Sequence, residues 1–153
     1  MNRDLTAVSS SRFSSDDNNA VSSTDSSTLL SLSQDLLDSI DQRNWERYTE
    51  LCDASLTAFE PEAVGHLVEG MPFHEYYLSP GPDGLSRQST ISCPHFRMMG
   101  DVAVISYIRL QQATDDAGVV STRAMEETRI WQLQDDRWQH VHFHRSPAGS
   151  ITL

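Results

Sequence analysis

The C-terminal part of the chain alternates between long extended segments and short turns, and this pattern restricts the fold more than any other feature. Apolar and polar residues alternate over 88–99, 102–113, 119–133 and 138–145, which predicts four long strands. Between them stand Gly100-Asp101, the stretch 115–118 and the stretch 134–137, which are rich in turn-forming residues. Connections this short join antiparallel neighbours, so the segments predict a meander.

Helical patterns precede the strands. The apolar residues of the first pattern recur at helical spacing, and they predict an amphipathic helix with Ser26, Ser27 or Thr28 as its N-cap: Leu29, Leu32, Leu36, Leu37 and Ile40. A second short helix is predicted from Trp45 and is expected to end near Cys52-Asp53, and a third begins near Pro72, where the first turn tolerates a missing amide. A short strand over 56–59 is expected to end before Pro61. Helices followed by an antiparallel sheet indicate an α+β domain, with the N-terminal helices packed on one face of the sheet.

The first 27 residues differ from the rest of the chain. They contain nine serines and few large apolar side chains, so they cannot bury enough surface to offset the loss of chain entropy on folding. We therefore expect a disordered tail over 1–27, a folded domain over 28–148, and a short C-terminal tail over 149–153.

Composition excludes several classes of function. The formal charge of −11, from 22 acidic and 11 basic residues, argues against binding to nucleic acid or to anionic membranes. No apolar run longer than two residues precedes Leu29, so neither a signal peptide nor a transmembrane helix is predicted. The expectation is a soluble cytoplasmic protein of one domain, since 153 residues leave no room for a second catalytic domain.

Cysteines and histidines do not form a recognisable metal motif. Cys52 and Cys93 lack CxxC spacing, which favours reduced, partly buried thiols. His140, His142 and His144 alternate, so three imidazoles are predicted on one strand face. That face could chelate a metal or pack against a neighbouring subunit, and the second interpretation is favoured because no carboxylate ligand is suitably spaced. We expect no metal and no cofactor.

Residues of equal parity along three strands bring arginines together. Each of the last three predicted strands places four residues of equal parity on one of its faces. In chain order these are Ala103, Ile105, Tyr107 and Arg109; Met125, Glu127, Arg129 and Trp131; and Gln139, Val141, Phe143 and Arg145. If these sets share the concave face, Arg109, Arg129 and Arg145 line one cavity, with Tyr107, Trp131 and Phe143 around them. His74 is a candidate for the mouth of the cavity.

Two interpretations of this arginine cluster remain open. Three guanidinium groups cannot be buried together without anions, so Glu127, another carboxylate or an anionic ligand must accompany them. The cluster is therefore either an internal arginine–glutamate network or a cationic, aromatic-walled pocket for a small carboxylate or an acidic peptide segment. A β-bulge would shift the parity and break this argument.

Motifs for kinase activity and for calmodulin binding are not found. The sequence has no glycine-rich phosphate loop, no HRD and no DFG, so it lacks the parts that phosphoryl transfer needs. A calmodulin target would be a basic amphipathic helix, whereas the first predicted helix carries mainly aspartates as its charged residues. Calmodulin binding is therefore not supported.

Several segments together resemble the association (hub) domain of calcium/calmodulin-dependent protein kinase II. The resemblance covers residues 30–147 in order and rests on six motifs: TAFEPEA at 57–63, LVEGM at 67–71, FH at 73–74, YIRL at 107–110, EETRIW at 126–131 and VHFHRS at 141–146. It implies a nuclear transport factor 2-like cone, with helices closing a strongly curved antiparallel sheet. It also implies self-association into a large closed homo-oligomer, as two stacked rings, and an arginine-lined pocket at Arg109, Arg129 and Arg145 with His74 near its mouth.

The chain departs from that family at the loop 79–86, which looks shorter and richer in proline and glycine, and in carrying no kinase. A non-enzymatic homo-oligomer is the leading hypothesis. The first alternative is a small enzyme, since similar cones host isomerases, dehydratases and cyclases, with Glu127, His74 and Tyr107 as the candidate groups. The second is a regulatory partner that joins mixed rings with a hub-containing kinase.

Overall fold

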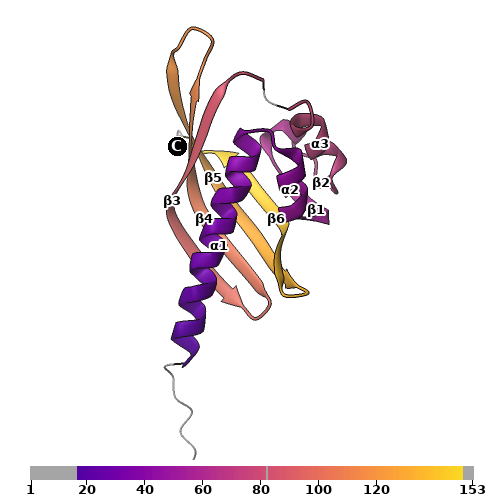
Figure 1. Ribbon diagram of the computed structural model, residues 1–153, viewed down its shortest axis with the longest axis vertical. Helices are drawn as coiled ribbons and strands as arrows, with labels where there is room; N and C mark the ends of the chain where they lie inside the picture. The colour runs from indigo at the N-terminus through magenta and orange to yellow at the C-terminus, as the bar shows by residue number, and fades with distance from the viewer. Residues whose placement is uncertain (1–16, 82, 150–153) are drawn as a thin grey trace, which may run out of the picture.

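A computed structural model describes residues 17–81 and 83–149, and it consists of one sheet with helices packed on one face (Figure 1). The helices are α1 (Asp17–Asp41), α2 (Trp45–Leu51) and α3 (Pro72–Leu78), with a 3₁₀ turn η1 (Pro61–Ala63). The strands are β1 (Cys52–Phe59), β2 (Val68–Glu69), β3 (Ser86–Met99), β4 (Val102–Thr114), β5 (Val120–Gln134) and β6 (Arg137–Pro147). The predicted α+β class is confirmed.

The sheet has six strands in the order β2-β1-β6-β5-β4-β3. The predicted meander is confirmed for β3 to β6, because each of these strands pairs antiparallel with the next. The pairing of β1 with β6 is parallel, and the sequence did not predict it. This pairing brings β1, and the residues that follow it, beside the end of β6.

The core lies between α1 and the inner face of the sheet. Leu29, Leu36 and Leu37 of α1 are fully buried, and they share one apolar cluster with Ile105 and Trp131 of the sheet. Side chains of this size contribute about 1.5–3 kcal/mol each when they leave water. Figure 1 shows α1 crossing this face, while α2 and α3 gather at one end of the sheet.

Helix α1 begins at Asp17, earlier than the predicted start near Thr28. Ser26, Ser27 and Thr28 therefore lie inside the helix, and their prediction as N-caps is wrong. The apolar stripe marks only the part of the helix that packs on the sheet. Serine is less favourable than alanine in a helix by less than about 0.7 kcal/mol per residue, so the helix can continue through the serines. The remainder of the predicted tail, 1–16, and residues 150–153 lie outside the described residues.

A β-bulge in β6 changes which side chains face the core. Ile130 pairs with His142 and Trp131 pairs with His140, so Val141 has no partner on β5. The bulge turns His140 inward, where it is fully buried, while His144 stays exposed. The predicted single face of three histidines is therefore wrong, and so is the predicted inward parity at Val141.

Within the described ranges, none of the helices is long and apolar enough to cross a membrane.

Candidate functional site

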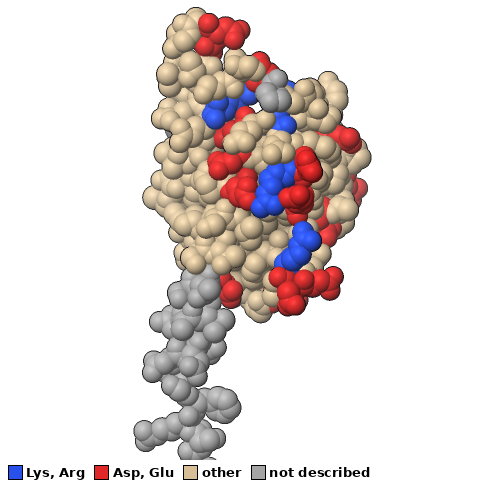
Figure 2. All heavy atoms as spheres, in the orientation of Figure 1, with Lys and Arg blue, Asp and Glu red and all other residues tan. Residues whose placement is uncertain are grey.

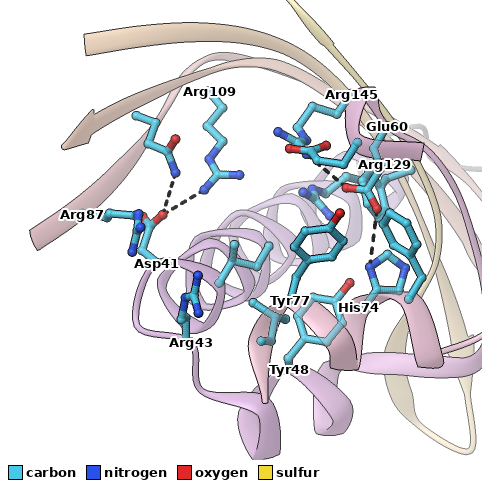
Figure 3. A pocket seen from close by; sticks show the side chains of 16 residues that line it. Asp41, Arg43, Tyr48, Glu60, His74, Tyr77, Arg87, Arg109, Arg129 and Arg145 are labelled. Carbon is cyan, nitrogen blue, oxygen red and sulfur yellow. Dashed lines mark hydrogen bonds and ion pairs between the residues drawn. The ribbon is translucent and has the colours of Figure 1, made fainter. Parts of the chain in front are cut away.

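A cavity of about 240 Å³ opens between the end of α1, helix α3 and the inner face of the sheet (Figure 3). Aromatic and aliphatic side chains form part of its wall: Ile40, Tyr48, Phe73, Tyr77, Leu78 and Phe143. The polar part of the wall consists of Asp41, Arg43, Glu60, Glu62, His74, Arg87, Arg109, Gln111, Arg129 and Arg145. All 11 basic residues of the chain are arginines, and five of them line this cavity.

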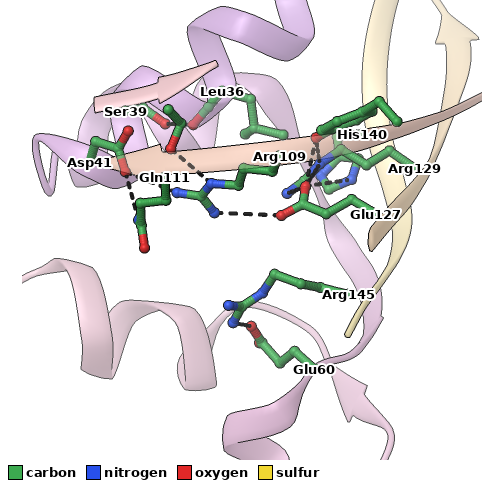
Figure 4. A network of polar contacts seen from close by, with 12 residues as sticks. Leu36, Ser39, Asp41, Glu60, Arg109, Gln111, Glu127, Arg129, His140 and Arg145 are labelled. Carbon is green, nitrogen blue, oxygen red and sulfur yellow. Dashed lines mark hydrogen bonds and ion pairs between the residues drawn. The ribbon is translucent and has the colours of Figure 1, made fainter. Parts of the chain in front are cut away.

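Arg129 is fixed by a buried network under the cavity (Figure 4). Its Nε donates to the hydroxyl of Tyr107 at 2.8 Å, and its Nη2 donates to Glu127 at the same distance. Its Nη1 lies 3.2 Å from Nε2 of His140, and the ring of Phe143 lies 4.7 Å from its guanidinium carbon. Among the described residues, Nη1 and Nη2 each have one partner, so each keeps an N–H for another acceptor.

Arg109 is held between the sheet and the last turn of α1. Its Nη2 donates to Asp41 at 2.9 Å and its Nε donates to Ser89 at 2.8 Å. Its Nη1 lies 3.5 Å from Glu127, so this carboxylate is shared between Arg109 and Arg129. Gln111 also donates to Asp41. The charge of Arg109 is thus largely balanced inside the protein.

Arg145 lies at the η1 side of the cavity, where β1 runs into the 3₁₀ turn. Its Nη2 donates to Glu60 at 3.0 Å and also contacts Glu62. Within the described part of the chain, its Nε and Nη1 have no hydrogen-bond partner. His74 of α3 stands next to Glu60, with 3.6 Å between Nδ1 and the carboxylate, and its buried Nε2 has no partner among the described residues.

A second pair of arginines lies at the other end of the cavity. Arg87 of β3 makes a two-point contact with Asp83, at 2.8 and 2.7 Å. Arg43, from the turn between α1 and α2, lies 3.3 Å from the same carboxylate. In Figure 3 these two arginines flank Asp41, across the cavity from Arg129 and Arg145.

Burial and neighbouring charges set the proton affinity of the site. Burial alone would raise the pKa of Glu127, but Arg129 and Arg109 outweigh it and hold that pKa below its ordinary value. Burial raises the pKa of Glu60 despite its contact with Arg145. Burial, reinforced by Arg129 and Arg145, lowers the pKa of His74 to about 4. At neutral pH the histidine is uncharged and Glu127 is ionised.

The predicted residues divide into two layers. Arg109, Arg129, Arg145, His74 and Phe143 line the cavity. Tyr107 and Glu127 belong to the network beneath it, and Trp131 is fully buried in the core. An internal arginine–carboxylate network, the first interpretation of the cluster, thus forms the floor of a cavity.

Sequence reasoning missed several lining residues. Arg87 shares its parity with Ser89 and Ile91, so a strand started at Ser86 instead of residue 88 would have placed it inward. Asp41 and Arg43 end the first helix, and no local pattern connects them with strands far along the chain. The net charge of −11 gave no indication of this internal concentration of arginines. On the face shown in Figure 2, acidic and basic side chains lie in small mixed groups.

Comparison with known proteins places this chain in a family. The family model described as the calcium/calmodulin dependent protein kinase II association domain matches residues 25–149. The chain belongs to this family. It is 42% identical over 131 residues to the rabbit (Oryctolagus cuniculus) kinase type II subunit delta, and 40% identical over 138 residues to the Drosophila melanogaster type II alpha chain. These matches cover 82% and 88% of the chain but only 24% and 26% of the relatives, so it spans about a quarter of their length.

Solved structures agree with the family assignment. The hub homology domain from Chlamydomonas reinhardtii is 46% identical, with a TM-score of 0.75 over 81% of this chain and 98% of that one. The association domain from C. elegans is 37% identical, with a TM-score of 0.76 over 85% of this chain and 98% of that one. A nuclear transport factor 2-like protein from Salmonella enterica, 18% identical over 86% of this chain and 96% of that one, has a TM-score of 0.71. The predicted nuclear transport factor 2-like fold is confirmed.

Proposed function

We propose that this association domain is a self-assembling module that forms a large closed homo-oligomer of stacked rings, and that its cavity binds a small carboxylate or an acidic peptide segment. The observation that carries the first half is family membership over residues 25–149, together with structural neighbours described as hub and association domains. The observation that carries the second half is the gathering of five of the 11 arginines around one cavity.

Exposed apolar side chains support assembly. Val64 is 83% exposed and Tyr76 is 76% exposed, near η1 and α3, whereas Val120 is 65% exposed at the start of β5. Figure 1 shows α3 and the β4–β5 hairpin on opposite sides of the molecule. Exposed apolar residues on two sides of the molecule suit a head-to-tail contact, in which one side meets the other on the next copy, and such contacts form a ring when the rotation closes.

Free hydrogen-bond donors support binding of an anion in the cavity. Arg145 offers Nε and Nη1, and Arg129 keeps one N–H on each terminal nitrogen, among the described residues. Cationic N–H donors of this kind form strong, charge-assisted hydrogen bonds to a carboxylate. The unpartnered Nε2 of the neutral His74 adds a further polar group beside them.

The geometry gives less support to catalysis. A proton-abstracting base works best with a pKa near the operating pH. The arginines that flank Glu127 keep its pKa low, which makes it a weak base. Tyr107 is a poor acid, because burial raises its pKa. These groups position Arg129, so binding is the function they suit.

Assembly is tested by the solution mass, measured by light scattering coupled to size exclusion at several protein concentrations. A large mass that does not change with concentration is expected. Val120→Asp should lower this mass, whereas Ser121→Asp, a change to the next exposed residue of β5, should leave it unchanged. A monomer or a simple dimer for the unchanged protein would contradict the assembly proposal.

Carboxylate binding is tested by calorimetric titration of the assembled protein with butyrate. Arg145→Gln should weaken binding by about tenfold or more, since it removes charge-assisted hydrogen bonds. Arg123→Gln, at an exposed position of β5, is the matched control and should bind like the unchanged protein. The absence of any binding heat at millimolar butyrate would contradict a carboxylate site.

A further inference from the structure

Arginines stand at two ends of the cavity. Arg129 and Arg145 stand at one end, and Arg43 and Arg87 stand at the other (Figure 3). Between them, the charge of Arg109 is balanced by Asp41 and Glu127. The wall between the ends includes the apolar side chains of Ile40, Phe73 and Leu78 and the ring of Tyr77.

The five carboxylates that neutralise these arginines are not equivalent. Glu127, Asp41 and Glu60 are buried, with 0%, 3% and 9% of their side chains exposed, so they belong to the interior. Glu62 and Asp83 are more exposed, at 41% and 26%. Each of these two comes from a segment outside the sheet. Glu62 lines the cavity and caps Arg145, whereas Asp83 is not a lining residue and caps the lining residues Arg87 and Arg43.

Both capping carboxylates can be exchanged for an incoming carboxylate, because the ligand restores the charge-assisted hydrogen bonds that they give up. Replacement of Glu62 would leave Arg145 paired with the buried Glu60. Replacement of Asp83 would free both Arg43 and Arg87 for one incoming carboxylate.

We propose that the cavity binds a linear dicarboxylate, with one acid group on Arg145 and Arg129, the other on Arg87 and Arg43, and the methylene chain against the apolar wall. In the free protein, Glu62 pairs with Arg145, and Asp83 pairs with Arg87 and Arg43. This inference rests on the proposed carboxylate site and adds the class of ligand that the site prefers.

The size of the site favours a small molecule over a peptide. Its volume of about 240 Å³ lies below the ~300–1,000 Å³ of pockets for drug-sized ligands. Arg87 and Arg145 stand on strands β3 and β6, and the register places them level with Ala113 and Tyr107 of β4. In a flat sheet they would be about 14 Å apart across the strands and about 20 Å apart along them. The two side chains reach inward and shorten this distance, so the acid groups must be separated by several carbons.

The test compares ligands that differ by one charge. The assembled protein is titrated calorimetrically with glutarate, adipate and pimelate, with the monomethyl ester of each, and with butyrate. At least one dicarboxylate should bind about tenfold or more tightly than its own monoester. Arg87→Gln should abolish that difference, whereas Arg123→Gln should preserve it.

A second pair of variants tests the capping carboxylates. Asp83→Asn should raise the affinity for the dicarboxylate without changing that for its monoester, because it frees Arg87 and Arg43. Arg43→Gln should have the opposite effect, and thermal unfolding checks that each variant is folded. Equal affinity for diacid and monoester, or an Arg87→Gln variant that keeps the preference, would overturn the inference while the butyrate site stands. If neither butyrate nor any dicarboxylate binds, the inference and the proposed carboxylate site both fail.

Discussion

Arg129 donates a hydrogen bond from Nη1 to Nε2 of His140 across 3.2 Å, and both side chains are fully buried. A guanidinium group can only donate, so the histidine must be neutral and must carry its proton on Nδ1. That nitrogen lies 3.5 Å from the sulfur of Cys52. The histidine therefore helps to hold the central arginine of the cavity in place, from a strand position that the bulge in β6 turns inward.

Loss of this acceptor should destabilise the fold. In His140→Leu, an N–H of the buried Arg129 loses its partner, which costs about 1–3 kcal/mol of unfolding free energy. Denaturant unfolding at fixed protein concentration measures the change. His144→Leu, the same substitution on the exposed side of β6, should stay within about 0.5 kcal/mol of the unchanged protein. Equal stability of the two variants would contradict the role assigned to His140.

Stability should fall in mild acid. The pKa of His74 is about 4 in the folded protein, below its ordinary value of 6.5, because the side chain is buried near Arg129 and Arg145. Burial and Arg129 also hold the pKa of His140 well below that value. The unfolded chain thus binds more protons below pH 6.5, so each histidine lowers stability by up to about 1.4 kcal/mol per pH unit as the pH falls toward 4.

Unfolding by denaturant between pH 7 and 4.5 measures this slope. His74→Gln should make it shallower, since one of the two contributing groups is removed. Glu60 acts in the opposite direction, because burial raises its pKa and the folded state then gains protons on acidification. Stability that stays constant over this range, or a slope that His74→Gln leaves unchanged, would contradict the assignment.

The inner face of β4 and β5 could be predicted from parity alone. Both strands keep a continuous register with each other, so Ala103, Ile105, Tyr107 and Arg109 are buried as alternation requires. The same reasoning failed in β6, because one unpaired residue, Val141, reverses the parity before it. A bulge of this kind leaves no reliable mark in the composition of a strand.

The residues at one end of the cavity could be predicted from the sequence, whereas those at the other end could not. Arg129 and Arg145 follow from strand periodicity, and they also match the family motifs. Arg43 and Asp83 lie in turns, where no repeat fixes the direction of a side chain, and their contact depends on how α1 and β3 pack. The ion pair between Asp41 and Arg109 joins residues that are 68 positions apart, a distance that local patterns do not span.

Glu127 should be the most sensitive carboxylate of the site. Its side chain is fully buried and contacts both Arg109 and Arg129, so Glu127→Gln leaves two buried cations with one charge partner fewer. Breaking a buried pair in this way costs about 3–5 kcal/mol. Thermal and denaturant unfolding should show this loss, while Glu126→Gln, at the exposed neighbour, should have little effect. A Glu127→Gln variant as stable as the unchanged protein would show that the arginines do not need this carboxylate.

The thiol of Cys52 should be unreactive in the folded protein. Burial raises its pKa to about 12, so almost no thiolate forms at neutral pH, and the side chain is only 4% exposed. Since the thiolate is the reactive species, a Cys93→Ser variant should give no signal with a thiol reagent until denaturant unfolds it. One thiol per chain should then appear, with an onset that follows the loss of structure. Rapid labelling of the folded variant would mean that β1 and β6 separate at Cys52. The contacts from Cys52 through His140 to Arg129 would then not hold Arg129 in place all the time.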